Sequence, residues 1–148
     1  MEHFTYLGSV TSNDATVSKD LDNCLSKANT SSGRLSKRAW QSNLLCLSIE
    51  IPVYRAVIIP TLLYSAETWV LYQKQIRILE QFHQHYLRSI LDIKWQDHVS
   101  KEVLKRASLP SIESILLQEQ LHWAGHVTRM EDICMPKAVF FSELKEGK

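Results

Sequence analysis

No apolar run in this sequence is long enough to cross a lipid bilayer. The longest lies at residues 57–71, is interrupted by Pro60 and Glu67, and reaches sixteen residues when counted from Ala56. A membrane-spanning helix needs about 20 apolar residues and tolerates a carboxylate poorly. The first nine residues, MEHFTYLGS, contain neither the basic segment nor the apolar segment of a secretory signal. Both absences predict an intracellular protein, in the nucleus or the cytoplasm, without a membrane partner.

Neither sign of charge is in excess, and cysteine is scarce. The 17 lysines and arginines are balanced by 16 aspartates and glutamates, which leaves a net charge of +1. Nucleic acid would therefore have to be bound by local basic patches, because no global basic field exists. The three cysteines, Cys24, Cys46 and Cys134, are odd in number and far apart. We expect buried thiols in a reducing compartment, not disulfides.

The apolar residues that are present predict a helical protein. The chain has 148 residues, of which 45% are hydrophobic and 22% charged, as is typical of a globular domain. Residues 57–71 are predicted to form a buried helix packed on nearly all sides, which Pro60 should end or kink. Residues 3–10 are rich in β-formers. The predicted fold is mainly α: a bundle of five to seven helices with a short N-terminal β-strand or hairpin.

Four further segments show helical periodicity. Residues 16–47 begin with a predicted N-cap at Ser18, and TSSG at residues 30–33 leaves two helices and one long helix both open. Residues 73–91 give the clearest amphipathic pattern, and residues 100–107 and 111–130 are also predicted helices. The apolar face of the first segment carries Val17, Leu21, Cys24 and Ala28. The core side of the second carries Ile76, Leu79, His83, Tyr86, Leu87 and Ile90. The stripe of the last segment carries Ile112, Ile115, Leu116, Glu119, Trp123, Val127 and Met130, widened by Leu121 and Ala124.

Four motifs resemble one protein family in their order and rough spacing. The central motif is Pro-x-Leu-Leu-Tyr-x-x-Glu-x-Trp at residues 60–69. The others are Phe-x-Tyr-Leu-Gly-Ser at residues 4–9, Leu-Arg-x-Ile-Leu-x-Ile-x-Trp at residues 87–95, and Leu-x-Trp-x-Gly-His-Val-x-Arg-Met at residues 121–130. Together they look like the region that follows the polymerase palm in the reverse transcriptases of non-LTR (LINE-type) retrotransposons.

This resemblance implies a fragment of a polymerase and not a complete enzyme. Residues 1–15 would be a β remnant of the palm, residues 16–97 a thumb-like helical region, and residues 98–148 a C-terminal helical region packed on it. Two-metal polymerase chemistry needs carboxylates that hold two ions, and the sequence contains no adjacent pair of aspartates. By resemblance, the Mg²⁺ of the intact polymerase would be held elsewhere, and this fragment would have no cofactor. Its partners would be RNA, an RNA–DNA duplex, and the missing palm and fingers.

Basic residues in three segments are candidates for nucleic-acid contact. Arg77 and Arg88 share a polar stripe with Gln81 and Gln84, and long donors along one face suit a phosphate backbone. An ordinary solvated face would explain the same patterns. By resemblance, the Gly-His-x-x-Arg motif would contact nucleic acid or another domain, although capping of the helix end is an alternative. The candidates are Lys27, Arg34, Lys37, Arg38, Arg77, Arg88, His126 and Arg129.

Other residues are predicted to be structural. A carboxylate within an apolar run is costly unless it is paired, so we expect Glu67 to form an ion pair with Arg55. Trp95, with the apolar residues Ile93 and Val99 on either side of it in the chain, is predicted to fill the core. The structural candidates are Tyr64, Glu67, Trp69, Trp95, Trp123 and Gly125.

Two other functions stay open. His122 and His126 are four residues apart on a helix, but a zinc site needs three or four ligands, and no Cys-x-x-Cys is present. A hydrolase built on the histidines is disfavoured, because no nucleophile, base and orienting acid fall together. The stronger alternative is a helical protein–protein interaction module without enzymatic activity.

Overall fold

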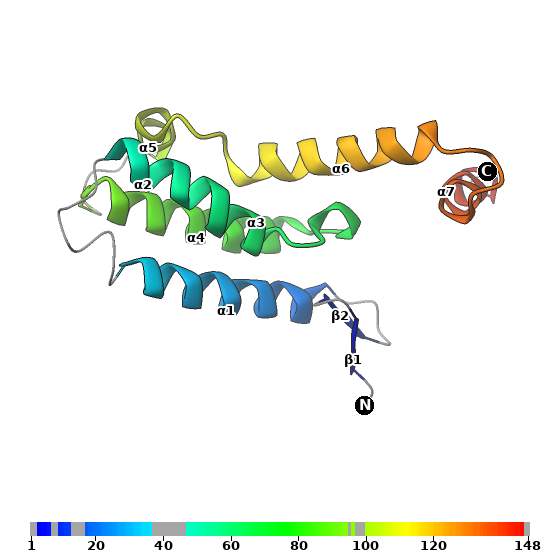
Figure 1. Cartoon of the computed structure of the whole chain (residues 1–148), viewed down its shortest axis with the longest axis horizontal. Coiled ribbons are helices and arrows are strands. Elements are labelled where there is room, and N and C mark those ends of the chain that lie inside the picture. The colour runs from blue at the N-terminus through cyan, green and yellow to red at the C-terminus, as the bar shows by residue number, and fades with distance from the viewer. Residues whose placement is uncertain are drawn as a thin grey trace.

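Helices make up most of the chain, as the sequence predicts. The computed structural model describes residues 3–6, 9–12, 17–36, 47–94, 96 and 100–146 (Figure 1). These contain an N-terminal hairpin and six helices, when the continuous helical residues 47–62 are counted as one helix and the single 3-10 turn at residues 66–68 is left out. The elements are β1 (His3–Tyr6), β2 (Ser9–Ser12), α1 (Ser18–Leu35), α2 (Leu47–Val53), η2 (Tyr54–Ile58), α3 (Ile59–Leu62), η3 (Ala66–Thr68), α4 (Gln73–Ile90), α5 (Ser100–Ala107), α6 (Ile112–Arg129) and α7 (Met135–Glu146).

The hairpin pairs two four-residue strands. β1 and β2 are antiparallel, with His3 opposite Ser12 and Tyr6 opposite Ser9. Tyr6 and Ser9 of the Tyr-Leu-Gly-Ser motif thus pair with each other, whereas Leu7 and Gly8 fall outside the described residues. A hairpin of this size is marginally stable alone, so its order depends on the neighbouring α1, which β2 contacts.

Helix α1 is one continuous helix up to Leu35. The TSSG segment does not break it, and Cys24, Ala28 and Ser32 continue one buried face through that segment. The predicted N-cap at Ser18 is wrong: the helix begins there, its N-cap position is Val17, and the Ser18 hydroxyl instead accepts a hydrogen bond from Gln75 of α4 (3.4 Å).

The apolar run at residues 57–71 is not the single helix that its composition predicts. α2, η2 and α3 follow one another without a break, and the chain leaves the helix after Leu62. Pro60 lies inside this helical segment because η2 is a widened π turn, in which the Ile59 N–H donates to the Tyr54 carbonyl five residues earlier. Such a bulge relieves the clash that proline would otherwise make with the preceding turn. Beyond the helix, Val70 is 73% exposed.

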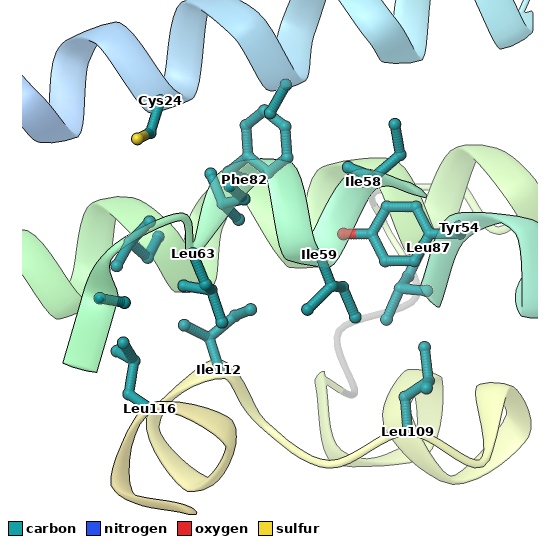
Figure 2. Close-up of a cluster of buried hydrophobic side chains, with 14 of the residues drawn as sticks. Cys24, Tyr54, Ile58, Ile59, Leu63, Phe82, Leu87, Leu109, Ile112 and Leu116 are labelled. Carbon is teal, nitrogen blue, oxygen red and sulfur yellow. The ribbon is translucent and has the colours of Figure 1, made fainter. Parts of the chain in front are cut away.

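The core lies between three layers of helices. In Figure 1, α1 lies on one side of a middle layer made by α2–η2–α3 and α4, and α6 lies on the other. Figure 2 shows side chains from all three layers converging, including Cys24 of α1, Tyr54 of η2, Leu87 of α4 and Ile112 of α6. One hydrophobic cluster thus joins residues on both sides of the boundary predicted at residues 97 and 98.

Several predicted core positions prove to be on the surface, Glu119 of the α6 stripe among them. Leu121, placed on the apolar stripe of α6, is 64% exposed. Cys134, expected to be buried, is exposed because it lies in the turn between α6 and α7, whereas Cys24 is buried as predicted. Cys46 and Trp95 lie outside the described residues. Among the helices that the structure describes, none combines the length and apolar character needed to cross a bilayer.

The start of α6 is held by α4 as well as by its own cap. The Ser111 hydroxyl accepts from the Ser114 N–H (3.3 Å), as expected of an N-cap. The Glu80 carboxylate of α4 accepts from the Ile112 N–H (3.1 Å) through Oε2 and from the Gln84 amide (3.2 Å) through Oε1. A carboxylate at a helix N-terminus also interacts favourably with the helix dipole. Glu80 therefore connects the middle layer to α6.

Replacing Glu80 by alanine is expected to lower the free energy of unfolding by about 0.5–2 kcal/mol, the usual range for loss of a helix cap. Urea unfolding followed by circular dichroism would measure the change. Gln81→Ala, at an exposed position one residue along the same helix, is the matched control and should change stability by less than about 0.5 kcal/mol. Equal losses in the two variants would contradict the cap.

Candidate functional site

The Pro-x-Leu-Leu-Tyr-x-x-Glu-x-Trp motif folds into one structural unit that is fixed to α1. After α3 ends, Ser65 adopts a left-handed conformation (φ 62°), η3 makes one turn, and Trp69 continues in an extended conformation. The Trp69 indole N–H and the Ser65 hydroxyl both donate to Oδ2 of Asp20, at 3.1 and 3.3 Å. Asp20 and Trp69 are 4% and 5% exposed. A buried carboxylate that receives these donors keeps residues 64–69 against the first turn of α1.

Asp20 is the buried acid of this region, and Glu67 is not. The predicted ion pair between Glu67 and Arg55 is absent from the described residues, and Arg55 is exposed on η2. Glu67 is only partly buried, so its charge stays hydrated without a basic partner. Nothing in the sequence near Asp20 indicated this role beyond its favourable place in the first turn of a helix, because its partners lie 45 and 49 residues away.

Cys24 lies beside this unit. Its thiol donates to the Tyr64 carbonyl (3.8 Å). Burial, together with the nearby Asp20 charge, raises the pKa of Cys24 to about 11, while Lys27 acts in the opposite direction. A thiol that stays protonated is a poor nucleophile. Cys24 is therefore suited to packing and not to covalent chemistry.

Glu67, Trp69 and Trp123 line a single apolar groove of about 1050 Å³. The groove lies between α6, α7 and the segment at residues 67–71. Trp123 also contacts Phe140 of α7 edge to face, with ring centroids 6.2 Å apart. Tyr64 does not line this groove; the residue is 49% exposed and lines a shallow depression with Lys27 on the α1 side.

The predicted cations of α1 and α4 are on accessible faces. Lys27, Arg34 and Arg77 are exposed, and Arg88 is half-buried. Arg77 takes part in no ion pair within the described ranges. Lys37 and Arg38 lie outside the described residues.

The Gly-His-x-x-Arg motif forms the last turns of α6. His126 and Arg129 are exposed there. A Cβ added at Gly125 would lie 3.2 Å from Nη1 of Arg129, so the guanidinium group folds back over the glycine backbone. Gly125 thus makes room for a side chain of its own helix.

These cations do not form one continuous surface. α1, which carries Lys27 and Arg34, and α6, which carries His126 and Arg129, lie on opposite sides of the middle layer (Figure 1). Any nucleic acid bound by this chain alone would therefore contact one side at a time, or wrap around α4.

Tyr54 and His83 form a buried polar pair that the sequence did not reveal as a pair. Both are 0% exposed, and the Tyr54 hydroxyl lies 3.0 Å from Nδ1 of His83. Burial lowers the pKa of His83, although the Glu80 charge and the Pro110 carbonyl act in the opposite direction. Burial, with Tyr86 and Glu80 contributing, raises the pKa of Tyr54. Without access to solvent, the pair is structural.

No cluster of three His, Cys, Asp or Glu side chains suited to a metal occurs in the part of the chain that the structure describes. His122 and His126 are both exposed on α6.

Comparison with protein-family models, with curated proteins and with solved structures finds no match to this chain. The resemblance to reverse transcriptases is therefore an expectation that depends on the four sequence motifs alone.

Proposed function

We propose that this chain is a non-catalytic helical part of a non-LTR retrotransposon reverse transcriptase, and that it holds the RNA template and the growing RNA–DNA duplex. The observation that carries the proposal is the order of four motifs along nearly the whole sequence. In this proposal the catalytic aspartates and their Mg²⁺ belong to a palm that this sequence lacks, and the chain acts inside the cell beside that palm and its fingers.

The exposed arginines of α4 and α6 give the proposal its physical basis. Arg77 and Arg129 are both exposed, on two different helices. Guanidinium groups bind phosphates through several donors, and such contacts are independent of base sequence. A polymerase that moves along its template needs contacts of this kind. With a net charge of +1, the chain must bind through these local contacts.

A salt titration of binding to an RNA–DNA duplex tests the proposal. The logarithm of the association constant should fall linearly as the logarithm of the salt concentration rises, because each phosphate contact releases counterions. Arg77→Ala and Arg129→Ala should each flatten this slope by about one unit. Fluorescence anisotropy of a labelled duplex would measure it.

Arg106→Ala is the matched control for lost charge. Arg106 is exposed on α5 and pairs with Glu102 of the same helix at 3.6 Å, so its removal should leave the slope unchanged. Two results would contradict the proposal. One is that the chain does not bind the duplex; the other is that all three variants change the slope of log association constant against log salt concentration equally. Absence of binding would favour the alternative function, a protein–protein interaction module.

A further inference from the structure

The apolar groove has three walls of defined composition. α6 contributes a helical stripe that runs from Glu113 through Leu117 and Gln120 to Ala124. α7 contributes Met135, Pro136, Val139 and Phe140, and the third wall consists of residues 67–71 with Ile76 of α4. In Figure 1, α7 lies beyond the C-terminal end of α6.

Specific contacts fix the walls relative to one another. The Gln120 side-chain amide donates to the Trp69 carbonyl (3.0 Å), which joins α6 to the third wall. Lys137 donates to the Met130 carbonyl (2.8 Å) and pairs with Asp132 (2.6 Å) across the turn between α6 and α7. The groove is thus formed before any partner binds, which reduces the entropy lost on binding.

The walls leave large apolar side chains in water. Val70 and Met135 are 73% and 78% exposed, and Leu117 and Val139 are each 56% exposed. Contiguous apolar surface of this kind usually marks an interaction site in a water-soluble domain. The four side chains come from all three walls, so a single inserted segment would cover them together.

The charge of the groove restricts its partner. Two carboxylates, Glu67 and Glu113, line it, and no lysine or arginine is among the described residues of its walls. Phosphate groups would be repelled here, whereas basic side chains beside an apolar face would be attracted. The groove is therefore distinct in chemistry from the cationic surfaces of α4 and of the α6 C-terminus.

The length of the groove sets the size of the partner. Its α6 wall extends over eleven residue steps, from Glu113 to Ala124, or about 16 Å at 1.5 Å per residue. This is the length of a three-turn helix. We infer that the groove binds one amphipathic helix of a partner protein, about three turns long, with an apolar face flanked by lysine or arginine.

Two labelled synthetic peptides of about twelve residues test the inference by fluorescence anisotropy. Both carry the same leucine face; one has flanking lysines and the other flanking glutamates. The lysine peptide should bind at least about tenfold more tightly, the combined effect of two solvent-exposed charge pairs. Glu67→Lys combined with Glu113→Lys should abolish or invert this preference. Leu117→Ser should lower the affinity for both peptides about tenfold, since it removes an apolar contact from the centre of the α6 wall.

Glu119→Lys is the matched control, because Glu119 is exposed on α6 but does not line the groove. It should leave the preference for the lysine peptide unchanged.

Equal binding of the two peptides would overturn the inference, and so would a loss of preference in Glu119→Lys as large as in the variant that combines Glu67→Lys with Glu113→Lys. So would a dimer in sedimentation that Leu117→Ser dissociates, which would identify a second copy of the chain as the occupant. Displacement of the peptide by the RNA–DNA duplex would also overturn it. Arg77→Ala should leave peptide binding intact, so this test and the salt titration can fail independently.

Discussion

Replacing Trp69 by alanine is expected to lower the free energy of unfolding by about 3–5 kcal/mol, as large aromatic truncations in protein cores do. The indole is 5% exposed and belongs to the main hydrophobic cluster. It also donates to the buried carboxylate of Asp20, which would lose a partner without gaining water. Urea unfolding followed by far-UV circular dichroism would measure the loss.

The phenylalanine variant separates the hydrogen bond from the packing. Trp69→Phe keeps an aromatic ring but removes the N–H, and should cost about 1–3 kcal/mol. Asp20→Ala combined with Trp69→Phe should cost less than the sum of the two single changes, because each removes the same bond. Trp123→Phe is the control: Trp123 is half-buried, and its indole N–H has no hydrogen bond to a described residue. The hydrogen bond between Trp69 and Asp20 would contribute nothing to stability if the losses of the two single variants simply added in the double variant. The same would follow if Trp123→Phe cost as much as Trp69→Phe.

The elements that could be predicted are those with a local signal. Periodicity placed the amphipathic helix at residues 73–91 and the last long helix at residues 111–130, and the structure has Gln73–Ile90 and Ile112–Arg129. In both, the pattern of apolar residues within the segment determines which face is buried. Residues 57–71 carry no such pattern, because a nearly continuous apolar run fits any buried backbone. The π turn before Pro60 and the left-handed Ser65 could not be predicted from it.

The features of the site that were missed depend on distant residues. Asp20 is buried because Ser65 and Trp69, 45 and 49 residues further on, donate to it. The groove exists because α7 crosses the end of α6, and the sequence of α7 alone does not fix that placement. Gly125 and Arg129 were identified from a motif, but only the structure shows the guanidinium over the glycine. Local sequence patterns indicate which face of a helix is apolar or charged. Which side chains contact one another depends on tertiary packing between segments that are distant in the sequence.

The buried pair of Tyr54 and His83 is the second feature expected to have a large effect. Periodicity predicted the buried side of α4 that carries His83, and the structure confirms that the imidazole is 0% exposed. Its Nε2 atom has no partner of good hydrogen-bond geometry within the described chain, although the Pro110 carbonyl is near enough to favour the protonated ring. Burial nevertheless dominates and lowers the pKa below its ordinary value of 6.5. The folded protein therefore prefers the neutral ring.

Stability should consequently depend on pH. Well above pH 6.5 the ring is neutral in both the folded and the unfolded chain, and His83 adds no pH dependence. As the pH falls below 6.5, the unfolded chain binds a proton that the folded chain does not, so the free energy of unfolding decreases. The slope can reach about 1.4 kcal/mol per pH unit until the folded pKa is passed. Urea unfolding at a series of pH values between neutral and mildly acidic would measure it.

Two variants of the pair distinguish the titration of His83 from its packing. His83→Phe should remove the pH-dependent loss but cost about 1–3 kcal/mol at neutral pH, because the buried Tyr54 hydroxyl loses its partner. Adding Tyr54→Phe should restore most of that stability, since replacing both partners by apolar groups of similar shape is nearly neutral. His85→Gln, at the exposed histidine two residues away, should keep the parent pH profile. If the double variant lost stability on acidification as steeply as the parent, the titrating group would have to be another one, and the pair would serve only to fill the core.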